Sequence, residues 1–188
     1  QVFARENSRT MAVSAPLLQM GIKGQPAEGG AAQLRQRLLG ELACEALAGN
    51  SSPLYNRLYE KGLINSSFYL GYMDYPGCAL VAGGETKDPE GVRDAILQEG
   101  KQIAEEGMEE AFFQRLKKAA YGAYVRGLNS FETLCVEQAQ GYFAEQNPWT
   151  FPEIYDALTR QDVEEFLRVW IKPEQTSLIV IWPEEAGK

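Results

Sequence analysis

The sequence feature that most constrains the fold is an apolar run near the end of the chain, Ser-Leu-Ile-Val-Ile-Trp at residues 177–182. Successive residues of a β-strand point to opposite faces of the sheet, so a strand of this composition presents apolar side chains on both faces. Such strands lie in the middle of a sheet or beneath helices on both sides. The run therefore predicts that the chain is built around a β-sheet with residues 177–182 inside it.

Three further segments have the character of strands. Residues 11–23 form an extended segment, in which Pro16 indicates an edge strand or a strand broken near its start. Residues 67–73 place Phe68, Leu70 and Tyr72 on one face, and residues 78–82 are wholly apolar. The Asp-Tyr-Pro-Gly sequence at 74–77 is typical of a tight turn, so these two segments predict an antiparallel hairpin.

Helices account for most of the remaining chain, because apolar residues recur there every three or four positions. Ser52 before Pro53, and Asp88 before Pro89, are typical of an N-cap followed by a proline in the first helical turn. We expect helices over residues 34–47, 53–61, 89–103, 109–126, 130–142, 151–158 and 159–171.

The order of these elements predicts one domain. A strand, two helices, two strands, several helices and a final strand succeed one another, and no repeat or low-complexity tract is present. We therefore expect one helix-rich α+β domain over residues 11–182, with a mostly antiparallel sheet and helices packed on one face. Residues 1–10 are predicted to be a linker from a preceding half of the protein.

The chain contains no histidine, and this excludes several kinds of chemistry. Neither a Ser-His-Asp triad nor a Cys-His pair can form, and the common zinc sites need His or clustered Cys. The 18 Lys and Arg residues against 26 Asp and Glu residues give a net charge of −8, which argues against nucleic-acid binding. Residues 62–112 carry a net charge of −7, and we interpret this stretch as solvated helix faces rather than a docking surface.

The three cysteines, Cys44, Cys78 and Cys135, are too widely spaced for a disulfide framework or a metal cluster. Each lies among apolar residues, so we expect buried, unreactive thiols and a reducing compartment. No run of 18 apolar residues exists that would predict a membrane span, and no signal peptide is visible. The chain does not begin with Met, so we interpret it as part of a longer protein.

Two clusters with possible chemistry have simpler structural interpretations. Gly83-Gly84 follows a predicted strand but lacks the spacing of a nucleotide-binding loop, so a strand-to-helix connection with a glycine at positive φ is favoured. The four glutamates within residues 105–110 could hold a hard cation, but adjacent glutamates point to different sides of a helix. A solvated helix start is the better interpretation.

Tyrosine is concentrated in one part of the chain, with Tyr55, Tyr59, Tyr69, Tyr72 and Tyr75 inside 21 residues. Aromatic faces with polar tips are suited to a peptide-binding wall. Ordinary half-buried packing around a helix and a hairpin explains the same cluster and is the favoured interpretation.

The order of several motifs resembles a known family. Residues 13–23 look like an opening strand, and residues 52–64 resemble the helix pattern S-x-L-F-x-x-L-R-E-K-x-G-L. The hairpin, the Gly-x-Thr-x-Asp-Pro entry at 84–89 and the run at 178–183 follow in order. This sequence resembles the second half of the insulinase, pitrilysin and mitochondrial processing peptidase family. The run Leu-Tyr-Glu-Lys-Gly-Leu-Ile-Asn-Ser-Ser-Phe at 58–68 is most similar to bacterial cytoplasmic members.

The resemblance implies a duplicated architecture of the LuxS/MPP-like metallohydrolase type. The first half would carry the H-x-x-E-H helix that binds zinc and supplies the glutamate base. The second half, which this chain resembles, would be the inactive C-terminal domain and would close over the substrate. We therefore expect no catalytic residue, no metal ligand and no cofactor in this chain, with zinc in the missing half.

Four residues are candidate substrate contacts. In many family members an arginine and a tyrosine of the second half bind the substrate carbonyl. Tyr59 occupies the arginine position here and Asn65 the tyrosine position, so that pair of roles does not transfer directly. Tyr59 and Asn65 could still hydrogen-bond a peptide, and Tyr69 and Tyr72 on the following strand are the other candidates.

These observations lead to one favoured hypothesis and two alternatives. The chain is predicted to be the non-catalytic half of a cytoplasmic zinc metallopeptidase, with a peptide substrate and the zinc-bearing half, or a paired subunit, as partners. Alternatively, the whole protein is an inactive homologue that acts as a scaffold or partner subunit, since active and inactive chains pair in the family it resembles. An independent carboxylate enzyme ranks last, because no convergent pair of acidic residues is visible.

Overall fold

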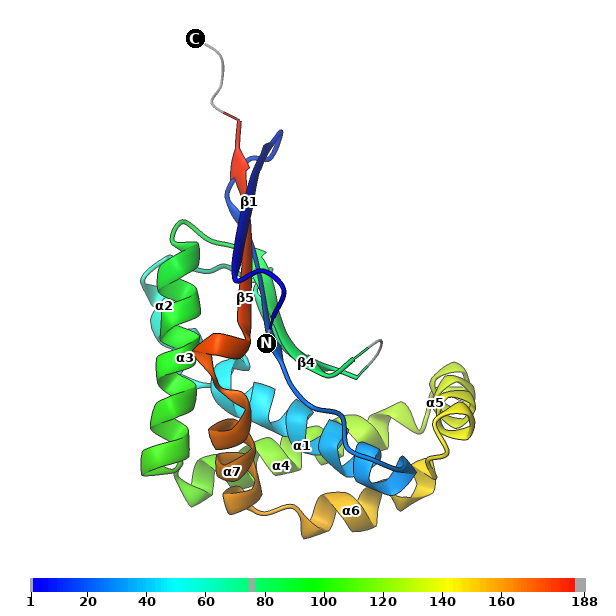
Figure 1. Ribbon diagram of the computed structural model, residues 1–188. Coiled ribbons are helices and arrows are strands. Elements are labelled where there is room, and N and C mark those ends of the chain that lie inside the picture. Colours follow the sequence, from blue (N-terminus) through cyan, green and yellow to red (C-terminus); the bar gives the residue numbers. More distant parts are fainter. Residues whose placement is uncertain (1, 75–76, 185–188) are drawn as a thin grey trace.

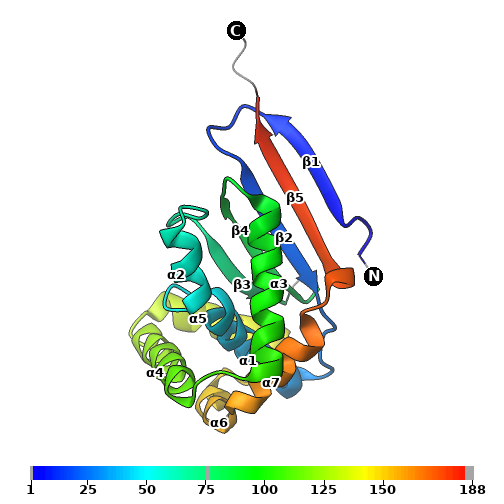
Figure 2. The same cartoon turned by 90° about the vertical axis from the view of Figure 1, so that its left-hand side faces the viewer.

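The computed structural model describes residues 2–74 and 77–184, which form one five-stranded sheet with helices against it (Figures 1 and 2). The strands are β1 (Glu6–Met11), β2 (Leu17–Lys23), β3 (Tyr69–Met73), β4 (Ala79–Glu85) and β5 (Thr176–Pro183). Their order across the sheet is β1-β5-β2-β4-β3, and every pairing is antiparallel except the parallel pair β1–β5. The predicted α+β class, the hairpin of β3 and β4 and the interior position of β5 are therefore confirmed.

Each predicted helical segment contains a helix in the structure, with bounds that differ by a few residues. The helices are α1 (Gly30–Ala48), α2 (Pro53–Glu60), α3 (Pro89–Glu106), α4 (Glu110–Gly127), α5 (Phe131–Phe143), α6 (Phe151–Ala157) and α7 (Arg160–Trp170). The predicted caps form, because the Ser52 hydroxyl accepts a hydrogen bond from the Tyr55 amide at 3.1 Å and the Asp88 carboxylate accepts one from the Gly91 amide at 2.9 Å. Within the described ranges, no helix is both long and apolar enough to cross a membrane.

One face of the sheet is buried and the other is open. Alternate residues of the three inner strands are almost completely buried beneath the helices. These residues are Leu18, Met20 and Ile22 of β2, Leu80 and Ala82 of β4, and Leu178 and Val180 of β5. Helices α1, α2, α3 and α7 lie on that side of the sheet (Figures 1 and 2). Ile179, between the two buried residues of β5, is 47% exposed, so helices cover this apolar strand on one side only.

The prediction of a linker over residues 1–10 is wrong for residues 6–10, which together with Met11 are in a strand. They form the edge strand β1, which pairs with β5 in the register Glu6 to Leu178. The Arg93 guanidinium of α3 binds the Glu6 carboxylate at 2.6 Å and ties the strand to the helix layer. The segment lacks apolar alternation, so periodicity gave no signal for it. What defines it is backbone pairing to β5, which depends on residues more than 170 positions away.

Helix α5 exists where it was predicted, but its large apolar side chains are mostly exposed. Phe131 and Tyr142 are largely exposed, as is Phe143 at the end of the helix, and Gly141 is its only buried residue. Cys135, expected to be buried, is exposed, whereas Cys44 and Cys78 are buried as predicted. Figure 1 shows the reason, because α5 stands beyond the tip of the hairpin, away from the sheet.

Glycines take the place of a loop at the end of the predicted hairpin. The turn predicted at 74–77 includes Tyr75 and Pro76, which lie outside the described residues. Gly83 and Gly84 belong to the end of β4, and Gly84 has a φ of 148°. A Cβ atom at Gly84 would lie 2.8 Å from the Phe68 backbone, so this glycine allows a close approach of two chain segments.

The first testable prediction concerns the contact between α1 and β3. A Cβ atom at Gly40 would lie 2.3 Å from the Tyr72 ring, so Gly40→Ala should lower the free energy of unfolding by about 1–3 kcal/mol through overpacking. Denaturant unfolding measures this change. Gly122→Ala is the matched control, because its Cβ would meet only an arginine side-chain atom at 3.5 Å. That control should stabilise α4 by about 1 kcal/mol, and a Gly40→Ala protein as stable as the wild type would contradict the packing account.

Candidate functional site

The open face of the sheet is the first candidate site. Strand alternation and register place a single set of side chains on it, at every second position of each strand. From β3 to β1 its central positions are Tyr69 and Gly71, Val81 and Gly83, Gln19 and Gly21, Ile179 and Ile181, and Asn7. Among all strand positions on this face only Arg9, Lys23 and Glu85 carry a charge, and they lie toward its margins. The centre of the face is thus uncharged and partly apolar.

Glycines give this face a shallow floor next to a tyrosine. Gly21 and Gly71 both pair with Val81, and a Cβ atom at either glycine would meet nothing within 4 Å. Another peptide backbone can therefore approach closely there. The ring of Tyr69 lies over Gly83, since a Cβ at Gly83 would be 2.8 Å from that ring, and the tyrosine remains 51% exposed. An aromatic side chain thus stands at one side of the glycine floor.

A polar corner closes the same end of the face. The Asn65 amide donates a hydrogen bond to the Glu85 carboxylate at 2.7 Å. The Asn65 side-chain oxygen accepts from the Ser67 amide at 2.8 Å and from its hydroxyl at 2.6 Å. Glu85 lies two residues after Gly83 on β4, so this pair is near Tyr69. The corner offers a carboxylate and an amide to a bound polar group.

The four predicted substrate residues are divided by the fold. Tyr69 lies on the open face and Asn65 lies at its corner. Tyr72 points to the opposite face, where its ring packs near Trp170 at a centroid distance of 5.7 Å and its hydroxyl donates to the Cys78 sulfur at 3.3 Å. Tyr59 lies on the outer side of α2 and stacks on Tyr55. The structure therefore brings two of the four together.

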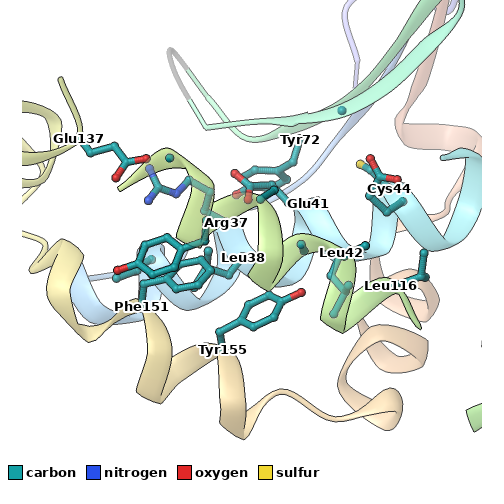
Figure 3. Close-up of a pocket in the computed structure, with 18 of the residues that line it drawn as sticks. Arg37, Leu38, Glu41, Leu42, Cys44, Tyr72, Leu116, Glu137, Phe151 and Tyr155 are labelled. Carbon is teal, nitrogen blue, oxygen red and sulfur yellow. The ribbon is translucent and has the colours of Figure 1, made fainter. Parts of the chain in front are cut away.

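A cavity of about 710 Å³ on the helix side of β3 is a second feature, and no sequence pattern indicated it (Figure 3). Its walls come from α1, α4, α5, α6 and β3. Charged side chains from two helices line it, namely Arg37, Glu41 and Glu45 of α1 and Glu137 of α5. Residues 37 and 137 are a hundred positions apart, so only the tertiary structure brings them together.

The pKa of Glu41 is shifted by its surroundings in the cavity. Burial raises the pKa of its carboxyl above the ordinary value, Asp74 and Glu137 raise it further, and Arg37 opposes them. Glu41 is nevertheless exposed to solvent, because it lies on the wall of the cavity and not in the core. The Arg37 Nε atom is buried and has no hydrogen-bond partner among the described residues. Burial also raises the pKa of the Cys44 thiol, so this cysteine stays protonated and unreactive.

The residues present do not fit a zinc ion. The chain has no histidine, and the described residues contain no group of three His, Cys, Asp or Glu side chains placed to hold a metal. The glutamates at 105–110 lie around the junction of α3 and α4, where Glu105 is within 3.8 Å of Lys101 and Glu110 within 3.5 Å of Arg160. Both glutamates thus pair with basic side chains at the surface, as the interpretation of this stretch as a solvated helix start predicts.

Comparison with known proteins identifies relatives. Residues 6–120 match the family model described as the peptidase M16 inactive domain. The Bacillus subtilis (strain 168) zinc protease YmfH, itself uncharacterised, is 28% identical over 189 residues. The match covers 97% of this chain and 43% of YmfH, so the chain spans less than half the length of that relative.

Two solved structures share the fold. An M16-like peptidase from Alicyclobacillus acidocaldarius superposes with a TM-score of 0.86 at 19% identity, over 96% of this chain and 44% of that one. The inactive peptidase domain of a zinc protease from Bordetella parapertussis gives a TM-score of 0.77 at 14% identity, over 96% of this chain and 97% of that one. The second structure has nearly the same extent as this chain and was solved as a separate domain.

The second prediction tests the charge at Glu41. A carboxyl whose pKa is raised by folding destabilises the protein once it ionises, and the effect vanishes below its ordinary pKa, where both folded and unfolded states are protonated. Glu41→Gln should therefore stabilise the protein at neutral pH, by less than about 1 kcal/mol because solvent screens the group. Thermal unfolding across a pH series measures this, and the difference should disappear in acid. Glu132→Gln on α5 removes an exposed charge and serves as control; an equal gain there would refute the assignment.

Proposed function

Because the chain belongs to the peptidase M16 inactive domain family, we propose that it is the non-catalytic wall of a zinc protease and encloses an extended peptide against a zinc-bearing half. The observation that carries this proposal is the open face of the sheet. A face with uncharged, partly apolar residues at its centre is unusual on an isolated domain and is typical of a surface that meets another molecule or domain.

The length of the relatives supports a second half as the facing partner. This chain corresponds to 43% of YmfH and 44% of the Alicyclobacillus peptidase, so in both proteins the domain is accompanied by a longer remainder. The exposed aromatic side chains of α5, Phe131, Tyr142 and Phe143, give a further apolar surface for that remainder to cover. In this proposal the catalytic residues and the zinc ion belong to the remainder.

The chemistry of the open face suits an extended peptide. Strand β3 lies at the edge of the sheet and pairs only with β4, so its outer backbone groups can bind a peptide strand. The floor at Gly21 and Gly71 permits close approach, and Tyr69 supplies an aromatic surface next to it. Asn65 and Glu85 would receive a polar or basic group. Tyr59 and Tyr72 lie elsewhere and have no part in this binding mode.

The third prediction tests the open face in the complete protein. Ile179→Arg places a charge at the centre of that face and should lower kcat/KM for peptide cleavage at least about tenfold, because an unpaired charge is costly where partner or substrate covers it. Val169→Arg is the matched control, since Val169 on α7 is 50% exposed and Ile179 is 47% exposed. Equal activity of the two variants, both folded by circular dichroism, would sink the proposal.

The fourth prediction separates a peptidase from an inactive scaffold. The 188-residue chain alone should hydrolyse no peptide, with or without added zinc. The complete protein should cleave peptides and lose this activity when a glutamate of an H-x-x-E-H motif in the preceding sequence is replaced by glutamine. A complete protein with no such motif and no hydrolysis would support the scaffold alternative. Cleavage by the isolated chain would overturn both.

A further inference from the structure

The cavity beneath β3 owes its existence to small side chains. Ala119, Ala120 and Ala123 of α4 line the cavity, and side chains this small leave space in front of the helix. The volume of about 710 Å³ lies within the range of about 300–1,000 Å³ that small-molecule sites occupy. On the floor, Leu38, Leu42 and Leu116 supply apolar surface. The cavity can therefore hold the apolar body of a ligand of moderate size.

One wall of the cavity is a stack of aromatic rings. Tyr124 of α4 and Phe151 of α6 stack with ring centroids 3.9 Å apart, and Phe151 and Tyr155 stack at 5.0 Å. Tyr72 enters from β3 on another side, and Figure 3 shows it above Leu42 and opposite Phe151 and Tyr155. Aromatic faces attract cations through the negative potential of their ring centres.

Charged side chains line the same cavity. Glu41 and Glu45 come from α1 and Glu137 from α5, and Arg37 is the only basic residue among the lining residues. Three carboxylates thus line the cavity against one guanidinium. Figure 3 shows Arg37 between Glu41 and Glu137, whereas the Glu45 carboxylate lies beside Gly49 at the end of α1. Asp74 adds a fourth negative charge close enough to raise the pKa of Glu41. The excess negative charge is left for a ligand to neutralise.

We propose that this cavity binds an organic cation carried on an apolar or aromatic body. The ammonium or guanidinium group of the ligand would lie among Glu41, Glu137 and the aromatic wall, and its body would fill the space beside the α4 alanines. A free amphipathic amine and a lysine or arginine side chain of a peptide share this chemistry. The excess of carboxylates disfavours an anionic ligand of the same shape.

This site is distinct from the open face used in the proposed function. Leu70 and Tyr72 of β3 point to the helix side and line the cavity, whereas Tyr69 points to the open face. Adjacent residues of one strand thus serve two surfaces. Loss of peptide cleavage on the open face and loss of cation binding in the cavity can be measured separately, so either idea can fail without the other.

The experiment uses two probes that differ only in the sign of their charge. The 188-residue chain is titrated with 2-phenylethylammonium and with 3-phenylpropionate, and binding is followed by calorimetry and by protein NMR shifts. A domain of nearly the same extent was solved alone from Bordetella parapertussis, which supports the use of the isolated chain. Saturable binding of the cation with shifts around Tyr155 and Ala123, and at least about tenfold weaker binding of the anion, is expected. Equal binding of the two probes, or binding of neither, would overturn the proposal.

Variants of the lining residues test which carboxylates bind the cation and which space holds the body of the ligand. Glu41→Gln and Glu137→Gln should each weaken cation binding about tenfold, whereas Glu132→Gln on the same helix as Glu137 should leave it unchanged. Ala123→Phe fills the cavity without altering charge and should abolish binding. Unchanged affinity in both glutamine variants would place the cation elsewhere and refute the site, and the two-probe comparison on the wild type remains valid if Ala123→Phe fails to fold.

A last arm distinguishes the two sources of the cation. A capped peptide with one lysine is compared with the same peptide carrying norleucine at that position. Tighter binding of the lysine peptide than of 2-phenylethylammonium assigns the site to a peptide side chain, and weaker binding assigns it to a free amine. A norleucine peptide that binds as well as the lysine peptide would contradict the requirement for a cation.

Discussion

The burial of one sheet face against α1 is the constraint on which the other features of this domain depend. Leu18, Leu80 and Leu178 project from three adjacent strands into one core with the apolar side of α1, and each is almost inaccessible to water. Burial of apolar surface on this scale is the main favourable contribution to folding. Because alternate strand residues must point the other way, the same packing leaves a second set of side chains, including Ile179 and Tyr69, on an open face.

The hairpin of β3 and β4 connects the two candidate sites. Its outward residues form the glycine floor and the Tyr69 surface, and its inward residues roof the cavity that contains Glu41. Tyr72 contacts Gly40 so closely that the hairpin and α1 form one unit. A ligand in the cavity would therefore press on the same strand that a peptide would use from the other side. That geometry gives a physical route by which one site could influence the other.

Much of the local structure could be predicted from the sequence, because local signals have local causes. The caps at Ser52 and Asp88 and the hairpin strands depend on residues within a few positions of one another. The failures are equally specific. Strand β1 has no apolar alternation and is held by β5, and the apolar stripe of α5 around Phe131 has no partner in the described residues. A periodic pattern shows that a helix has an apolar side but not what covers that side.

The sequence alone therefore determined the class of fold, the family and the absence of histidine chemistry, since each follows from residue types and their order along the chain. Only the tertiary structure decided which of the candidate substrate residues lie on the same surface, namely Tyr69 and Asn65. It separated Tyr69 from Tyr72 by the alternation of β3, and it joined Arg37 and Glu41 to Glu137 across a hundred residues. The reason is that a site is a set of distances between side chains, and packing between distant segments sets those distances.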